Sequence, residues 1–176
     1  EDNLEEDSNL IRHIEDMLVV QPRLFAVFDG GLIIYNFDTE TRDIIAVDDK
    51  LEAIELHEGT IYVGGEYLYE IQDDKLVRVE EEYPGGITSL QSHDYRLVVG
   101  TEAGLYSRGI FGHEALYEDI TVTALTSDGD GLWVGTRGQG LYRWDGDTFK
   151  KRYLLRDETL FDTVYALDFA RDHLYM

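Results

Sequence analysis

The sequence predicts an all-β protein, a β-propeller built of four-stranded antiparallel blades. Short runs of β-forming residues alternate with turns rich in Gly and Asp, which indicates short strands joined by tight turns. The pattern recurs, with first strands that begin at residues 14, 51, 87, 122 and 164, so the spacings are 37, 36, 35 and 42 residues. A period of about 40 residues that holds four strands is typical of propeller blades. We therefore expect about four complete blades and the start of a fifth, as part of a larger propeller.

The clearest copy of the repeat is the segment 122–149. Strands are expected at residues 122–125, 132–136, 141–144 and 148–153, separated by turns that contain Asp-Gly or Gly-Gln-Gly. A meander in a β-sandwich or an up-and-down barrel is the alternative fold. Those folds need regular strands, but they do not need the same turn chemistry after every fourth strand, so the propeller is favoured.

The domain organisation follows from the repeat. An acidic tail at residues 1–10 is expected to be solvated or to form a short helix, or else to dock on another domain. The blades are then expected at 11–50, 51–86, 87–121 and 122–163, with a partial blade at 164–176. Four and a half units do not form a regular closed ring, and three interpretations follow. The chain is a fragment of a larger propeller, which is favoured, or it completes a ring by association with other chains, or it closes as four blades with the terminal strands forming the seam.

A family resemblance becomes visible in the clearest copy. Its letters, V-T-A-L followed by D-G-L-W-V-G-T-R-G-Q-G-L-Y-R-W-D-G, resemble the repeat of two-component-regulator propellers, and in a broader sense the repeat is WD40-like. The resemblance implies seven-bladed propellers, often paired, in the extracytoplasmic sensor halves of bacterial hybrid histidine kinases. It implies a ligand-sensing input domain and supplies no catalytic residue.

Charge narrows the range of partners. The chain has 37 acidic and 15 basic residues, a net charge of −22 and a pI near 4.3. Duplex nucleic acid and anionic membrane surfaces are not expected as partners, because phosphate binding needs clustered cations. Only four of the basic residues are Lys, namely Lys50, Lys75, Lys150 and Lys151. That bias resembles proteins of salt-loving organisms, with an ordinary acidic, soluble surface as the alternative.

The compartment stays open, since a haloarchaeal protein would be cytoplasmic and a sensor domain extracytoplasmic. No apolar run approaches the roughly 20 residues of a membrane helix, so no membrane insertion is expected. The absence of Cys removes disulfides and thiolate chemistry.

No motif predicts a cofactor, a metal or a catalytic residue. The pieces Asp128–Gly131 and Asp145–Asp147 lack the closing Glu of a calcium loop and are interpreted as turns. His57 and His93 occupy equivalent positions in adjacent units, too far apart for one metal, and are interpreted as ordinary surface or turn histidines. Trp133, Tyr62, Tyr106 and Tyr142 recur at matching positions and are expected to pack between blades.

The candidate site is the face that carries the second-to-third and fourth-to-first connections, which lies around the central channel. Arg137 and Gln139 fall in the first kind of loop, and Tyr83 and Arg156 in the second. These side chains can hydrogen-bond or stack on a protein or small-molecule ligand. The sequence thus favours a non-catalytic binding scaffold. A sensory input domain is the first alternative, and a propeller lyase or hydrolase is the less favoured one.

Overall fold

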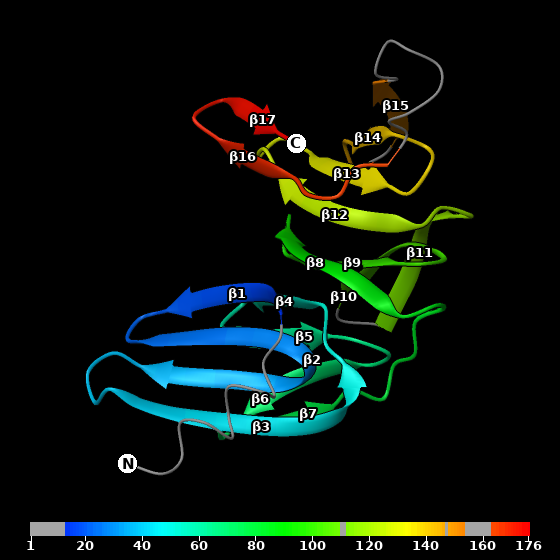
Figure 1. Cartoon of the computed structure of the whole chain (residues 1–176). Coiled ribbons are helices and arrows are strands. Elements are labelled where there is room, and N and C mark those ends of the chain that lie inside the picture. The colour runs from blue at the N-terminus through cyan, green and yellow to red at the C-terminus, as the bar shows by residue number, and fades with distance from the viewer. Residues whose placement is uncertain (1–12, 110–111, 147, 154–162) are drawn as a thin grey trace.

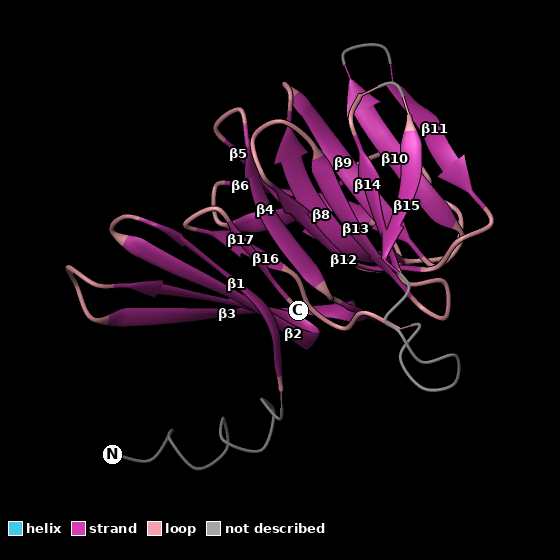
Figure 2. Ribbon diagram, turned by 90° about the horizontal axis from the view of Figure 1, so that it is seen from above, coloured by secondary structure: helices cyan, strands magenta, loops and turns pink. Residues whose placement is uncertain are grey.

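The computed structural model describes residues 13–109, 112–146, 148–153 and 163–176. These residues form 17 strand elements in five antiparallel sheets, which follow one another along the chain (Figure 1). Seen from above, the described part consists of strands and loops alone (Figure 2). No helix in it is long and apolar enough to cross a membrane. The predicted fold class, an all-β propeller of four-stranded antiparallel blades, is confirmed.

Blade 1 contains β1 (Ile14–Val20), β2 (Arg23–Asn36) and β3 (Thr41–Lys50). Blade 2 contains β4 (Ala53–His57), β5 (Thr60–Gly64), β6 (Leu68–Gln72) and β7 (Lys75–Arg78). Blade 3 contains β8 (Ile87–His93), β9 (Arg96–Thr101), β10 (Gly104–Gly109) and β11 (Gly112–Glu118). Blade 4 contains β12 (Val122–Ser127), β13 (Leu132–Thr136), β14 (Leu141–Trp144) and β15 (Phe149–Tyr153), and a hairpin of β16 (Asp168–Ala170) and β17 (His173–Tyr175) follows.

The long element β2 serves as both the second and the third strand of blade 1. Its first half pairs with β1 and its second half with β3. The backbone N–H of Phe37 donates to the carbonyl of Pro22 over 2.9 Å, so the two ends of β2 lie side by side. The reversal falls at Gly30, whose φ of +93° suits glycine. Blade 1 therefore contains four extended segments, β1, the two halves of β2 and β3, in the same order as the four strands of the other blades.

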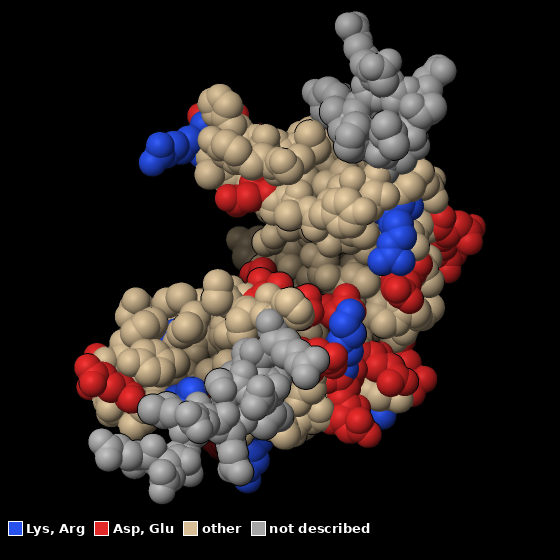
Figure 3. All heavy atoms as spheres, in the orientation of Figure 1, with Lys and Arg blue, Asp and Glu red and all other residues tan. Residues whose placement is uncertain are grey.

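The inner strands β1, β4, β8 and β12 are neighbours, and β16 contacts β12 (Figure 1). The blades form an arc, and the surface is hollowed between blade 1 and the hairpin β16–β17 (Figure 3). The apolar core lies between successive blades, in three clusters that join blades 1 and 2, 2 and 3, and 3 and 4. A sheet covers its apolar face only by packing on another layer, so each blade depends on its neighbours.

Aromatic residues at matching positions fill these interfaces. Tyr62, Tyr106 and Tyr142 are buried to more than nine-tenths and belong to the clusters. Trp133 is half-buried, and its indole N–H donates to Asp128 over 2.8 Å. The predicted packing role is confirmed for the three tyrosines.

A close approach between a glycine and a branched side chain recurs at three joints. The branched side chain belongs to the residue that begins the inner strand region of a blade. It packs against the glycine of the V-G pair in the preceding blade. A Cβ on that glycine would lie 2.4 to 2.8 Å from the branched side chain, which real contacts do not allow. The three pairs are Gly64 with Ile87, Gly100 with Val122, and Gly135 with Val164. The repeated V-G letters, Val63-Gly64, Val99-Gly100 and Val134-Gly135, thus specify how closely neighbouring blades approach.

β-Bulges at the start of β8 and β12 add a hydrogen bond to this joint. The register shifts between Ile87 and Ser89, and in the same way at the start of β12. The residue inside each bulge is Thr88 or Thr123, and its hydroxyl donates to the carbonyl of the first residue in the next blade. For Thr88 the distance to the Val122 carbonyl oxygen is 2.8 Å. A bulge is known to re-aim a side chain in this way.

The two equivalent histidines correct the sequence interpretation. His57 and His93 are buried, with 8% and 5% of their surface exposed, and are not surface residues. The Nδ1 of His57 lies 2.9 Å from the Oγ of Ser92, and the Nδ1 of His93 lies 2.9 Å from the Oγ of Ser127. Each pair joins one blade to the next. Burial lowers the pKa of His57, because desolvation disfavours the charged ring.

The predicted first strands that begin at residues 51 and 164 start later in the structure, at Ala53 and Asp168. In the second of them, the opening residue bonds to another sheet. The N–H of Val164 donates to the Thr136 carbonyl over 3.0 Å, and thus to the preceding blade. Sequence periodicity cannot distinguish an extended residue that pairs within its own sheet from one that bonds to the next sheet.

The glycine joint can be tested with Gly100→Ala. The new Cβ would lie 2.5 Å from Val122 Cγ1, and overpacking of this kind costs about 1–3 kcal/mol. We expect the free energy of unfolding, measured by chemical denaturation, to fall by that amount. Gly109→Ala is the control, since no atom lies within 4 Å of its added Cβ. Equal losses in the two variants would contradict the joint.

Candidate functional site

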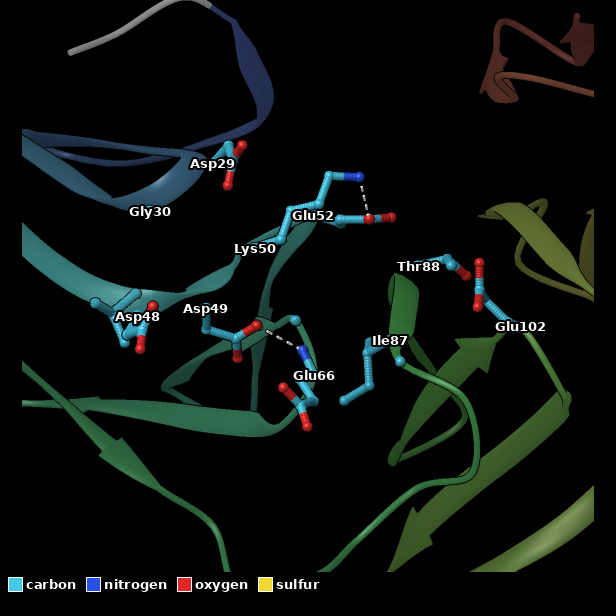
Figure 4. Close-up of a pocket in the computed structure, with 13 residues that line it drawn as sticks. Asp29, Gly30, Asp48, Asp49, Lys50, Glu52, Glu66, Ile87, Thr88 and Glu102 are labelled. Atoms are coloured by element: carbon cyan, nitrogen blue, oxygen red, sulfur yellow. Dashed lines mark hydrogen bonds and ion pairs between the residues drawn. The ribbon is translucent and has the colours of Figure 1, made fainter.

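The face that carries the second-to-third and fourth-to-first connections contains a pocket of about 530 Å³. This loop-face pocket is built by blades 1, 2 and 3 (Figure 4). Its walls come from the reversal of β2, the end of β3, and the loops that follow β5 and β9. Three blades contribute because the joints between blades bring their loops together on this face.

Carboxylates dominate the lining of the loop-face pocket. The acidic residues are Asp29, Asp48, Asp49, Glu52, Glu66 and Glu102, and the basic residue is Lys50. Lys50 Nζ lies 2.5 Å from Glu52 Oε1, and this hydrogen bond raises the pKa of the lysine. The resulting field inside the pocket is negative, because one ammonium faces six carboxylates.

Asp49 has a structural role within this set. It accepts hydrogen bonds from the backbone N–H of Glu66 over 2.8 Å and from the hydroxyl of Tyr69 over 2.9 Å. Blade 1 is thereby fastened to blade 2 at the floor of the pocket. The side chains of Asp48 and Glu66 line the same space (Figure 4) and are exposed, whereas Asp49 is half-buried, so Asp48 and Glu66 are more accessible to a ligand than Asp49.

The two predicted site residues in the second-to-third loop of blade 4 differ in their contacts. Arg137 is exposed, and its Nη1 lies 3.9 Å from the Oε1 of Glu102 at the pocket wall. Gln139 is held by the protein itself, since its amide donates to the Asp119 carbonyl over 3.1 Å and its Oε1 accepts from the Tyr142 hydroxyl over 3.3 Å. Arg137 is therefore exposed beside the pocket wall, whereas Gln139 is held by hydrogen bonds within the protein.

The other two predicted site residues are placed differently. Tyr83 is buried, with 7% of its surface exposed, and packs on the rings of Tyr106 and His113. Its hydroxyl is buried without a hydrogen-bond partner in the described residues, and burial raises its pKa. It also lines a hollow of about 340 Å³ beside Glu66. Arg156 lies outside the described residues, as do the long connection at 154–161, the acidic tail and Asp147.

The inner strands of all five sheets surround a channel of about 360 Å³. Asp16 accepts a hydrogen bond from the backbone N–H of Ile54 over 3.0 Å, and burial raises its pKa. Burial, together with the negative charge of Asp16, raises the pKa of Glu55 to about 7. The channel thus places two partly dehydrated carboxyl groups from adjacent blades near each other.

No group of three or more potential metal ligands occurs among the described residues. In the Asp-Gly turn of blade 4, the carboxylate of Asp128 binds the guanidinium of Arg143 through two hydrogen bonds of 3.0 Å. It also accepts from the Trp133 indole. This turn thus closes its own blade, which is the role the sequence predicted for it.

Sequence reasoning missed the acidic residues of the pocket. Glu66 and Glu102 stand at equivalent places in the second-to-third loops of blades 2 and 3, where blade 4 has Arg137. That repeat position could have identified them. Asp29 and Asp48 had no such signal, because acidic residues are common throughout this chain.

Comparison with known proteins identifies the fold and no family. No family model and no curated protein matches the chain. Among solved structures, the extracellular domain of the hybrid two-component system BT4673 from B. thetaiotaomicron superposes with a TM-score of 0.60 at 17% identity, covering 92% of this chain and 31% of that one. The WD40 propeller of Doa1 gives 0.66 at 13% identity over 92% of this chain and 60% of that one. The designed Ika4 protein gives 0.58 at 14% identity over 76% and 91%.

These likenesses show the propeller fold alone, because identities this low carry no functional information. The chain spans about a third of the sensor domain and under two thirds of the WD40 propeller.

The channel carboxylate predicts a pH-dependent stability. The pKa of Glu55 rises from 4.5 to about 7 in the folded state, so its contribution is complete below pH 4.5 and is lost as pH rises through 7. Glu55→Gln mimics the protonated form. We expect the variant to match the parent at pH 4.5 and to be more stable at pH 8, as measured by urea unfolding. The exposed control Glu40→Gln should show no such difference between the two pH values.

Proposed function

We propose that the chain is a non-catalytic binding scaffold, whose loop-face pocket holds a positively charged group of a protein or small-molecule partner. The observation that supports this function is the pocket itself, a cavity built by three blades and lined by six carboxylates. Ligand sites are commonly concave and formed where several elements meet. The overall charge of −22 would steer a cationic partner toward the protein.

The structural neighbours support a binding role in general terms. One is the extracellular domain of a two-component system, another is a WD40 propeller, and a third, BBS1N, was solved in complex with ARL6DN, at 16% identity and a TM-score of 0.64 over 90% of this chain and 56% of that one. A ligand-sensing input domain is the second candidate, which the likeness to the sensor domain favours. It predicts that the full-length protein carries a membrane span and a kinase module beside the propeller.

The pocket can be tested with a fluorescent tetra-arginine peptide and the double variant Asp48→Asn/Glu66→Gln. Removing two carboxylates from one site should weaken binding roughly 5- to 30-fold, equivalent to about 1–2 kcal/mol. Fluorescence anisotropy of the full chain provides the measurement. The matched control is Asp38→Asn/Asp43→Asn, which makes the same change in net charge at exposed positions of blade 1. Equal losses in the two double variants would mean that bulk charge, and not the pocket, attracts the peptide.

We also propose that the outward face of blade 1 binds the hairpin β16–β17 of a second copy. Ile14 stands where the other blades have Ile87, Val122 or Val164, yet it is 41% exposed while they are nearly covered. Met17 and Val19 are 61% and 53% exposed on the same strand. This face has the chemistry of a blade joint, and the hairpin presents Tyr175, with Tyr165 in the segment just before it, as apolar partners.

Light scattering tests this association. We expect a discrete dimer of the full chain, which Met17→Glu/Val19→Glu converts to a monomer. The dimer should be stronger at high salt, because salt screens the repulsion between two chains of charge −22, as in a protein adapted to salt. A parent chain that is monomeric at both low and high salt would refute the second copy as the occupant.

A further inference from the structure

The loop-face pocket continues into the central channel. Glu52 and Thr88, from neighbouring blades, line both the pocket of about 530 Å³ and the channel of about 360 Å³ (Figure 4). Glu55, which also lines the channel, lies three positions beyond Glu52 in the sequence, about 10 Å further along an extended chain. The two cavities therefore form one elongated space, which runs from the loop face along the inner strands.

Carboxyl groups without a cationic partner lie in both parts of this space. In the loop-face pocket these are the exposed side chains of Asp48 and Glu66. In the channel they are the partly buried side chains of Asp16 and Glu55, from adjacent blades. Between the two parts, Glu52 is already paired with Lys50. No Lys or Arg occurs among the described residues that line the channel, so each part offers a separate position for a cationic group.

The channel also offers hydrogen-bond acceptors that carry no charge. The inner strands β1, β4, β8, β12 and β16 each stand at the end of their sheet, and such an edge leaves carbonyl and N–H groups unpaired. Two N–H groups of these strands already donate to the channel carboxyl groups, that of Ile54 to Asp16 over 3.0 Å and that of Ser92 to Glu55. Thr126 lines the channel and is 8% exposed, and its hydroxyl makes no hydrogen bond to another described residue. The channel therefore suits a ligand that donates hydrogen bonds.

These features together favour a linear ligand with two or more protonated amines. An ammonium group is compact and carries three N–H donors, so it can bond to carboxylate, carbonyl and hydroxyl oxygens at once. A quaternary ammonium has the charge but no such donors. A metal ion is not favoured, since no group of three or more potential ligands occurs among the described residues. The length of the joined cavities requires a flexible chain between the charged groups.

We propose that the joined pocket and channel bind a linear aliphatic polyamine, with one ammonium group beside Asp48 and Glu66 and another beside Asp16 and Glu55. This inference rests on the proposed function, because the first ammonium group occupies the loop-face pocket. The methylene chain passes the junction of the two cavities, where Lys50 already satisfies Glu52. Pairing with an ammonium group offsets the cost of holding the channel carboxyl groups away from water.

The experiment measures binding of spermidine to the full chain by titration calorimetry, in about 0.15 M salt to screen charges that are far apart. We expect spermidine to bind, and Asp16→Asn/Glu55→Gln to weaken it roughly tenfold, as expected for loss of charged hydrogen bonds. Asp38→Asn/Asp43→Asn is the matched control, because it makes the same change in net charge at exposed positions. No binding of spermidine, or equal losses in the two double variants, would overturn the proposal.

A second measurement uses the parent protein, so it does not depend on how the double variant folds. Burial and the charge of Asp16 raise the pKa of Glu55 to about 7, and Glu15, Glu52 and Asp168 line the same channel. Glu55 is therefore about half protonated at pH 7, and a bound ammonium group favours its ionised form. Calorimetry in phosphate and in Tris at pH 7 should show that spermidine releases up to about half a proton from the parent and none from Glu55→Gln. Binding without proton release by the parent would overturn the channel as the second position.

The tetra-arginine peptide separates this inference from the proposed function. Asp48→Asn/Glu66→Gln should weaken both ligands, whereas Asp16→Asn/Glu55→Gln should weaken spermidine and leave the peptide unchanged. If the peptide depends on the loop-face pocket and spermidine does not depend on the channel, the polyamine is refuted while the proposed function stands. Butylamine, which has a single ammonium group, should bind at least roughly tenfold more weakly than spermidine. Equal binding of the two amines would show a single position for a cation and would also overturn the proposal.

Discussion

The approach of a blade to the glycine of its neighbour is the constraint on which the rest of this structure depends. The blades have no separate cores, because their apolar residues meet in clusters between sheets. A side chain in place of Gly64, Gly100 or Gly135 would hold the sheets apart and disturb the packing of the tyrosines that fill the space between them. The threonine in each bulge and the two histidine–serine pairs then set the rotation of one blade against the next.

Because packing depends on the joints between blades, the loops on the two faces of the propeller are free to vary in sequence. The loops take no part in the glycine joints, so the acidic residues of the loop-face pocket do not interfere with packing. Titratable groups at the joints are instead paired with opposite charges or desolvated. Arg108, between blades 2 and 3, is paired with carboxylates from blade 2, and burial lowers the pKa of His57. Buried charge requires such partners, whereas charge at a loop is solvated.

The candidate site shows how far sequence reasoning reaches. Blade topology places the same two kinds of loop at one end of every sheet, so a face can be chosen from the repeat alone. The residues were harder to choose. Tyr83 is buried in the joint between blades 2 and 3, whereas Asp29 and Asp48 of the pocket carry no sequence signal in a chain with 37 acidic residues. Which side of a sheet a loop residue faces depends on the twist and packing of the whole blade.

The sequence by itself determined the fold class, the repeat and most strands of the best copy, because strand periodicity and turn chemistry are local properties. Leu132–Thr136 and Leu141–Trp144 have the predicted bounds. Only the tertiary structure decided that β2 forms both the second and the third strand of blade 1 and that His57 and His93 are buried residues that bond to the next blade. It also decided that three loops distant in sequence enclose one acidic pocket. Each of these depends on contacts between neighbouring blades that join residues some 35 positions apart in sequence, and strand periodicity and turn chemistry do not contain such contacts.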